Sequence, residues 1–193
     1  QEGKHWRVLT AQEGIASNNV QSALEDREGT LWVAGSGTGL DRLPGVHDWS
    51  AWTTTEGLPD NATLSTLRDH QGRLWVSTGR GIGIWDGQTQ RWERVPTLQG
   101  QTKDEIRQMQ LAGDGSVWAL TATGALLRID ARNFSTTTTP SYHGRSFVSI
   151  LAAPDGSVWA TARAHLLRFD PRKATPTPVE IPLPGQITGD VEY

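Results

Sequence analysis

The stretch Asp69-His-Gln-Gly-Arg-Leu-Trp75 recurs in altered form three more times in this chain of 193 residues. The other copies are Asp26-Arg-Glu-Gly-Thr-Leu-Trp32, Ala112-Gly-Asp-Gly-Ser-Val-Trp118 and Ala153-Pro-Asp-Gly-Ser-Val-Trp159. The four tryptophans follow one another at intervals of 43, 43 and 41 residues. This regularity predicts a tandem repeat in which each Trp has the same structural task.

Each copy predicts a tight turn followed by a strand. In the first two copies an Asp carboxylate can accept backbone N–H groups across the turn, and a Gly three residues later can adopt a positive φ. The strand then carries the Trp toward a neighbouring sheet, where we expect all four tryptophans to be buried. The residues with this structural role are Asp26, Gly29, Trp32, Asp69, Gly72, Trp75, Gly115, Trp118, Gly156 and Trp159.

Segments rich in Thr and apolar residues predict four short strands in every repeat. The first strands are expected at Val20–Glu25, Thr63–Arg68, Ile106–Leu111 and Phe147–Ala152. The second strands carry the four tryptophans, and the third are expected at Leu40–Leu43, Ile82–Asp86, Leu126–Asp130 and Leu166–Asp170. The fourth are expected at Trp49–Thr54, Gln90–Val95, Phe134–Thr138 and Thr177–Ile181. Tandem units of about 40–45 residues with four strands predict an all-β fold, a β-propeller of four-stranded antiparallel blades.

The repeat also predicts how the chain is divided. We expect a single β-propeller segment over residues 1–193, with about four complete blades, near 15–54, 58–96, 101–139 and 144–182. Residues 5–11 and 186–193 are expected to be strands of incomplete blades. Since closed propellers have roughly four to eight blades, this pattern predicts an unclosed ring. The chain is then either a fragment of a longer protein, which we favour, or one of two copies that complete a ring together.

Composition excludes several functions. The formal net charge is −3 without a basic run, so no nucleic-acid partner is expected. There is no apolar run of membrane-spanning length, so no membrane contact is expected within the segment. The absence of Cys excludes thiolate catalysis and Cys-ligated zinc, and the five His form no metal-binding motif. We therefore expect neither a cofactor nor a metal.

Candidate contact residues come from the predicted loops, since rigid sheets position such loops for binding. Chosen by loop position, they are Asn18, Asn61, Arg80, Thr123, Arg163 and His165. His165, just before a third strand, is an ordinary surface residue or, alternatively, the base of a lyase. Trp52 and Trp85 are out of phase with the repeat, so they either pack internally or form exposed stacking surfaces such as sugar platforms.

The first two repeats resemble a known family. Glu56-Gly-Leu-Pro-Asp-Asn61, Asp69-His-Gln-Gly-Arg-Leu-Trp-Val76 and Thr78-Gly79 are similar to the two-component regulator propeller repeat, and Glu13-Gly-Ile15 with Asp26–Val33 matches nearly as well. The resemblance implies a periplasmic sensor segment of a bacterial receptor anchored in the inner membrane. Its output module, a histidine kinase or a diguanylate cyclase, would lie outside this chain.

The fourth repeat resembles a second family. Asp155-Gly-Ser-Val-Trp159, followed by Leu166-Leu-Arg-Phe-Asp170, is similar to the virginiamycin B lyase propeller, which implies an enzyme as the alternative. A pure protein-interaction scaffold is the third possibility. We expect a non-catalytic module that recognises an unknown small molecule or oligosaccharide. Its other partners would be the remaining blades of a longer chain or a second copy.

Overall fold

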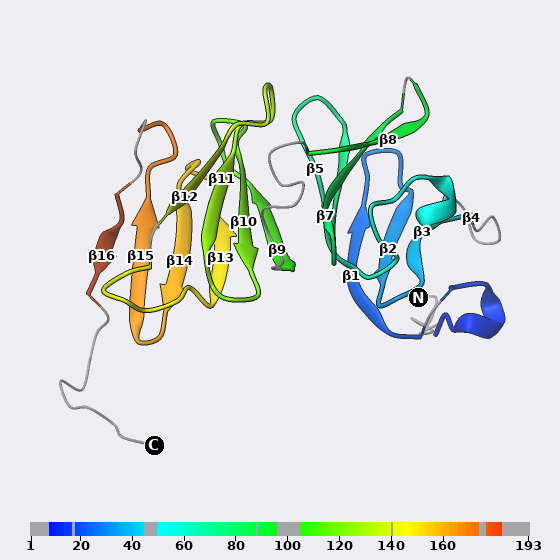
Figure 1. Ribbon diagram of the computed structural model, residues 1–193, viewed down its shortest axis with the longest axis horizontal. Helices are drawn as coiled ribbons and strands as arrows, with labels where there is room; N and C mark the ends of the chain where they lie inside the picture. Colours follow the sequence, from blue (N-terminus) through cyan, green and yellow to red (C-terminus); the bar gives the residue numbers. More distant parts are fainter. Residues whose placement is uncertain are drawn as a thin grey trace, which may run out of the picture. The chain divides into compact units, whose positions relative to one another are not determined.

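The computed structural model describes residues 8–16, 18–44, 50–87, 89–95, 105–139, 141–173 and 177–182. These residues form sixteen strands, two short 3-10 helices and no α-helix. The strands make four separate sheets of four, and in every sheet the strands lie in sequence order (Figure 1). This simple up-and-down order is the arrangement predicted for each repeat.

The elements have the following bounds. The first sheet contains β1 Val20–Glu25, β2 Leu31–Gly35, β3 Gly39–Leu43 and β4 Ser50–Trp52. The second contains β5 Thr63–Arg68, β6 Leu74–Thr78, β7 Gly81–Asp86 and β8 Arg91–Arg94. The third contains β9 Ile106–Leu111, β10 Val117–Thr121, β11 Leu126–Ile129 and β12 Thr136–Thr139. The fourth contains β13 Ser149–Ala152, β14 Val158–Ala162, β15 His165–Phe169 and β16 Val179–Ile181, and the 3-10 helices are η1 Ala11–Glu13 and η2 Thr54–Glu56.

The predicted and observed bounds agree best for the first strand of each sheet. β1, β5 and β9 have the predicted bounds, while β13 begins two residues later than expected. The fourth strands are three or four residues long and are shorter than predicted. Of the strand expected at 5–11, the structure describes residues 8–11, which are not strand, and Ala11 begins η1. The strand expected at 186–193 lies outside the described residues.

The chain divides into two compact units, residues 1–109 and 110–193. In the first unit, the first and second sheets pack against each other. The Thr63 hydroxyl on β5 donates to the carbonyl oxygens of Gly35, at 3.1 Å, and Gly39, at 2.8 Å. Apolar side chains from both sheets form the shared core, which contains Trp32, Ala34, Leu40, Leu58, Leu74 and Val76.

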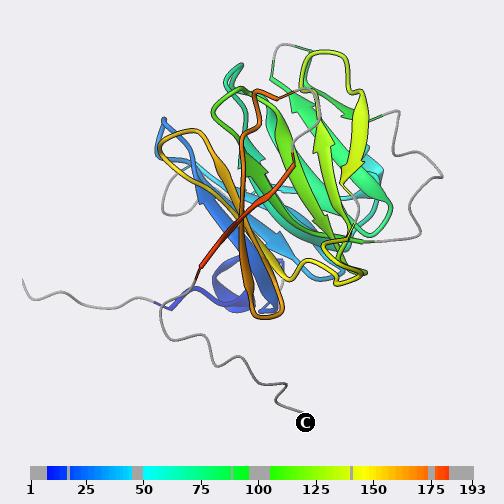
Figure 2. The same ribbon diagram turned by 90° about the vertical axis from the view of Figure 1, so that its left-hand side faces the viewer.

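The second unit is built in the same way, and Figure 2 views it from the side of β16. The turns before β10 and β14 meet so closely that a Cβ on Gly113 would lie 2.5 Å from the Cα of Gly156. Next to this approach, the Trp118 ring packs against Phe169, with ring centroids 5.3 Å apart. A Trp on the second strand of one sheet thus packs against the third strand of the next.

Three of the four repeat tryptophans are buried as predicted, with exposed fractions of 3% for Trp32, 0% for Trp75 and 0% for Trp118. The prediction for Trp159 is wrong, because this side chain is only partly buried. Trp159 pairs in register with Leu151, which is 60% exposed on the same face of the fourth sheet. Among the described residues this face stays open, so nothing completes the burial of Trp159.

A hydrogen bond from the indole ties the buried Trp to its turn in the first two repeats. The indole N–H of Trp32 donates to the Asp26 carboxylate at 2.8 Å. That of Trp75 donates to Asp69, also at 2.8 Å. The turn Asp therefore satisfies both the backbone of the turn and the one polar atom of the buried ring.

In the third and fourth repeats a serine hydroxyl, rather than an Asp carboxylate, accepts the indole N–H of the Trp. The indole N–H of Trp118 donates to the Ser116 hydroxyl at 3.2 Å, and that hydroxyl donates to Asp114 at 2.6 Å. Trp159 donates to Ser157 in the same way, at 3.0 Å. The Asp-Gly-Ser form of the turn, with Ala in place of the first Asp, therefore also provides an acceptor for the indole N–H.

Replacing Asp69 by Ala is expected to lower the free energy of unfolding by about 3 kcal/mol, because it leaves a buried indole N–H without an acceptor. The Asp69 side chain is 2% exposed and accepts hydrogen bonds from Gln71, Arg73 and Trp75. Urea unfolding at neutral pH measures the effect. Asp155→Ala is the matched control, since its side chain is 52% exposed and Trp159 bonds to Ser157 instead. Equal losses in the two variants would contradict the assigned role of the indole hydrogen bond.

Candidate functional site

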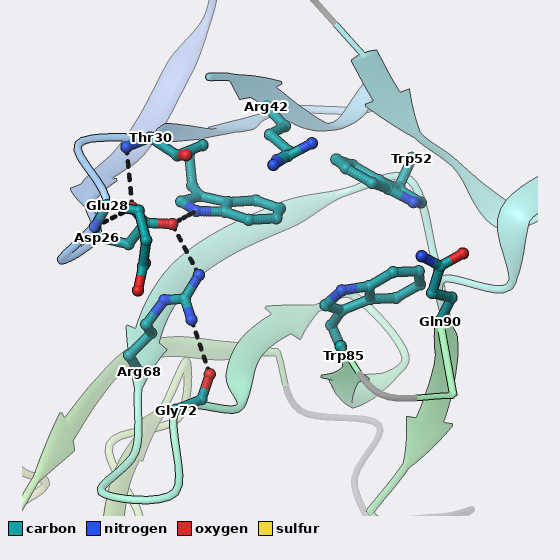
Figure 3. A pocket seen from close by; sticks show the side chains of 11 residues that line it. Asp26, Glu28, Thr30, Arg42, Trp52, Arg68, Gly72, Trp85 and Gln90 are labelled. Carbon is teal, nitrogen blue, oxygen red and sulfur yellow. Dashed lines mark hydrogen bonds and ion pairs between the residues drawn. The ribbon is translucent and has the colours of Figure 1, made fainter. Parts of the chain in front are cut away.

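A half-open pocket of about 580 Å³ lies in the first unit (Figure 3). Its walls come from the turns between β1 and β2, β5 and β6, and β7 and β8, together with side chains of β2 to β5 and β7. The lining residues are Asp26, Glu28, Thr30, Trp32, Arg42, Trp52, Arg68, Gly72, Trp85, Gly87 and Gln90. The volume is in the usual range for a small-molecule site.

Three tryptophans form the aromatic part of the wall. Trp32 stacks on Trp52 with centroids 5.4 Å apart and an interplanar angle of 26°. Trp85 lies 5.6 Å from Trp52 at a steeper angle of 56°. Trp52 and Trp85 are partly exposed, so they pack internally and also face the pocket, which combines the two alternatives raised from the sequence.

The acidic part of the wall is a closed network around Asp26. One carboxylate oxygen accepts the backbone N–H groups of Glu28, at 3.1 Å, and Thr30, at 2.9 Å. The other accepts the Trp32 indole N–H at 2.8 Å and a guanidinium N–H of Arg68 at 2.7 Å. Burial raises the pKa of Asp26, but the hydrogen bonds from Trp32 and Thr30 and the charge of Arg68 outweigh it, so the net pKa lies below 3.8.

Arg42 and Gln90 complete the wall on the tryptophan side. The Arg42 guanidinium lies over the Trp32 ring, 5.7 Å from its centroid, and in Figure 3 it points toward Trp52. Gln90 is exposed and has a φ of 50°, a left-handed conformation that is uncommon outside Gly. Its carboxamide also points toward Trp52 in Figure 3. This side of the pocket therefore combines ring faces with hydrogen-bonding groups.

The side chains of both asparagines predicted as ligand contacts also have structural partners. The Asn18 side-chain oxygen accepts the backbone N–H of Ala11 at 2.8 Å. The Asn61 oxygen accepts that of Thr54 at 2.7 Å. Each bond spans seven residues and ties the start of a 3-10 helix to the loop before β1 or β5. Their binding role stays a prediction.

Arg80, in the turn between β6 and β7, is 76% exposed and pairs with Asp60 at 3.1 Å. Asn61 follows Asp60, so Arg80 and Asn61 lie in neighbouring loops. Both belong to the end of the sheet where β5 begins, whereas the pocket lies at the turns where β1 and β5 end. These two predicted contacts and the pocket therefore lie at opposite ends of the strands in the first unit, and the binding role of Arg80 stays a prediction.

The other three predicted contacts lie in the second unit. The Thr123 hydroxyl is 3.2 Å from that of Thr121, and Arg163 is exposed in the turn before β15 with a φ of 52°. His165 Nδ1 lies 2.5 Å from a Glu180 carboxylate oxygen. The hydrogen bond from His165 is the largest cause of the lowered pKa of Glu180, followed by one from Tyr142. Nothing in this geometry assigns these residues to a ligand, and their role stays a prediction.

Neither a metal centre nor a membrane span is found in the described part of the chain. There, no three His, Asp or Glu side chains gather closely enough to hold a metal ion. No helix within the described ranges has the length and apolarity needed to cross a bilayer.

Several solved structures share the fold. The extracellular domain of a protein from B. thetaiotaomicron described as a hybrid two component system, BT4673, matches with a TM-score of 0.70 and 18% identity, over 86% of this chain and 24% of that one. The equivalent domain of BT3049 matches with a TM-score of 0.70 and 19% identity, over 85% and 24%. Virginiamycin B lyase from Staphylococcus aureus matches with a TM-score of 0.70 and 12% identity, over 87% and 57%. At these identities the likeness shows the fold alone, a β-propeller of four-stranded antiparallel blades.

The family match is more specific. Residues 14–37 and 57–80 match the family described as two component regulator propeller, which confirms the resemblance in the first two repeats. The chain spans about a quarter of the length of the two-component extracellular domains named above. No curated protein matches this sequence. The two matching segments include Asp26, Trp32, Arg68 and Gly72 of the pocket.

Arg68→Met removes the cation beside Asp26, whose side chain is 3% exposed. A depressed carboxyl pKa stabilises the fold above the unfolded value near 3.8, and this contribution is lost as the pH falls below it. Without Arg68 the pKa of Asp26 should rise, so acid unfolding should begin at a higher pH. At pH 7 we expect a loss of about 1–2 kcal/mol, because Arg68 is partly exposed.

Urea unfolding between pH 3 and 7 measures this effect. Arg172→Met is the control, because Arg172 is 75% exposed and its partner Asp170 is 45% exposed. An Arg68→Met variant whose acid transition coincides with that of the unmodified chain would refute the assigned charge network.

Proposed function

We propose that this chain is a segment of the extracytoplasmic, ligand-recognising region of a bacterial signal-transduction receptor. The observation that carries the proposal is that the segments matching the two component regulator propeller family also form much of the pocket wall. The similar structures from B. thetaiotaomicron are described as extracellular domains, which supports a periplasmic location. The output of such a receptor, anchored in the inner membrane, would be a histidine kinase or a diguanylate cyclase.

The pocket of the first unit is the proposed binding site, and the ligand is a small molecule or an oligosaccharide. Partly exposed Trp52 and Trp85 offer ring faces to a sugar ring or another flat ligand, while Arg42 and Gln90 offer hydrogen bonds. Binding would change the output only if the ligand has a higher affinity for one arrangement of the receptor than for the other.

The segment is proposed to bind its ligand without converting it. The likeness to virginiamycin B lyase supports an enzyme as the second candidate, in which His165 is the residue to test. An enzyme would consume the ligand, whereas a sensor would release it unchanged. A pure interaction scaffold would bind no small molecule at all.

The open face of the fourth sheet is proposed to pack against a further blade or a second copy. Leu151 and Val179 are 60% and 58% exposed there, beside the partly buried Trp159. Trp118, at the equivalent position of the third sheet, is fully buried against Phe169. The same contact on the open face would bury Trp159.

Trp52→Ala and Trp85→Ala are each expected to weaken ligand binding at least tenfold, because each removes a ring from the pocket wall. The probes are neutral and acidic oligosaccharides of two to four units, measured by calorimetry and intrinsic fluorescence. Mass spectrometry of the recovered sugar should show no conversion.

Gln90→Gly tests the pocket even if the Trp variants misfold. Gly adopts a φ of 50° without strain, so this substitution removes only the side chain. It should lower affinity several-fold without lowering stability, while Trp159→Phe in the second unit should leave affinity unchanged. Binding unaffected by all three pocket variants would overturn the site, and conversion of the sugar would favour the lyase.

A further inference from the structure

A third-strand arginine recurs in three of the four repeats, opposite the repeat Trp. The paired positions are Trp32 with Arg42, Trp118 with Arg128, and Trp159 with Arg168. In the third sheet this arginine forms an ion pair with the turn carboxylate, from Arg128 to Asp114 at 2.9 Å. In the fourth, Arg168 reaches Asp155 at 2.7 Å. The acidic residue at the equivalent place of the first repeat, four positions before the Trp, is Glu28, and within the described ranges no ion pair joins Arg42 to it.

Arg42 makes no ion pair with the Asp26 carboxylate either, because that carboxylate is already engaged by other groups. Arg68, from the first strand of the second sheet, pairs with Asp26 at 2.7 Å. The remaining bonds to Asp26, from Glu28, Thr30 and Trp32, occupy both carboxylate oxygens. Within the described ranges no carboxylate forms an ion pair with Arg42, and its guanidinium lies over the Trp32 ring at the pocket.

The groups around Arg42 are mainly hydrogen-bond donors. Arginine and the indoles of Trp52 and Trp85 can donate but not accept, while the Gln90 carboxamide can do both. The acidic side chains Asp26 and Glu28 lie together at the other side of the pocket in Figure 3. The pocket therefore has Arg42, donors and two ring faces at one side, and the two acids with Arg68 at the other.

We infer that this pocket takes a carboxylated sugar, with the carboxylate on the Arg42 guanidinium and the sugar ring beside Trp52 and Trp85. A guanidinium binds a carboxylate through two parallel hydrogen bonds, and within the described ranges Arg42 forms no ion pair that such a ligand would have to break. The opposite side, with Glu28, accepts hydrogen bonds from sugar hydroxyls. This inference rests on the proposed function and specifies its ligand class.

The experiment compares oligosaccharides of glucuronic, galacturonic and mannuronic acid with their neutral hexose counterparts, by calorimetry in 20 mM and 200 mM salt. At least one acidic sugar should bind at least tenfold tighter than its neutral counterpart. The preference should shrink at the higher salt, as expected for a pairing with a partly exposed charge.

Arg42→Gln should weaken the acidic sugar at least tenfold and its neutral counterpart less than twofold. Arg168→Gln is the matched control, because it removes the equivalent arginine outside the pocket and should change neither affinity. Urea unfolding confirms that both variants are folded.

Neutral and acidic sugars that bind equally, with no effect of Arg42→Gln, would overturn the inference and leave the proposed sensor function standing. Benzoate competing as strongly as the acidic sugar would show that the ligand is an aromatic acid, which also overturns it. The absence of binding by every sugar would overturn the proposed function as well.

Discussion

The fold depends on one interaction, the hydrogen bond from each repeat Trp to its own turn. Burying a Trp between two sheets is costly unless its indole N–H finds an acceptor there. Asp69 accepts this N–H together with two backbone N–H groups, so one carboxylate closes the hairpin and fixes the ring. Ser116 takes over the acceptor role where the Asp sits two positions later in the turn. The hydrogen bond from the indole N–H to the turn is therefore kept, although a different residue accepts it.

In the first repeat, the turn and the Trp joined by this hydrogen bond form part of the pocket wall. Asp26 is fully engaged by its turn, its Trp and Arg68, a residue of the neighbouring sheet. That arrangement leaves Arg42 at the pocket, over the ring that Asp26 fixes. The ion pair that the third-strand arginine forms in the third and fourth sheets is thus not found in the described residues of the first repeat, where Arg42 lies at the pocket. Asp26 thus fixes the ring over which Arg42, the proposed ligand contact, lies.

The sequence predicted the parts of the fold that depend on local chemistry. Turn residues and β-branched runs are local, which is why β1, β5 and β9 have the predicted bounds. The burial of Trp159 was not predictable in this way, because it depends on a further sheet against its face. The pocket was predicted only in part, since Trp52 and Trp85 were named as possible stacking surfaces while Arg42 and Gln90 were not. The recurring third-strand arginine is visible in the sequence, but the ion pair between Arg68 and Asp26 depends on how two sheets pack.

A double-mutant cycle between Asp69→Ala and Trp75→Phe tests the central claim most directly. Phe keeps most of the ring and loses the indole N–H, so the coupling between the two changes isolates the hydrogen bond. Urea unfolding of the four proteins should give a coupling free energy of about 1–3 kcal/mol, as for a buried bond to a charged acceptor. A coupling indistinguishable from zero would contradict the account, because the turn and the Trp would then stabilise the fold independently.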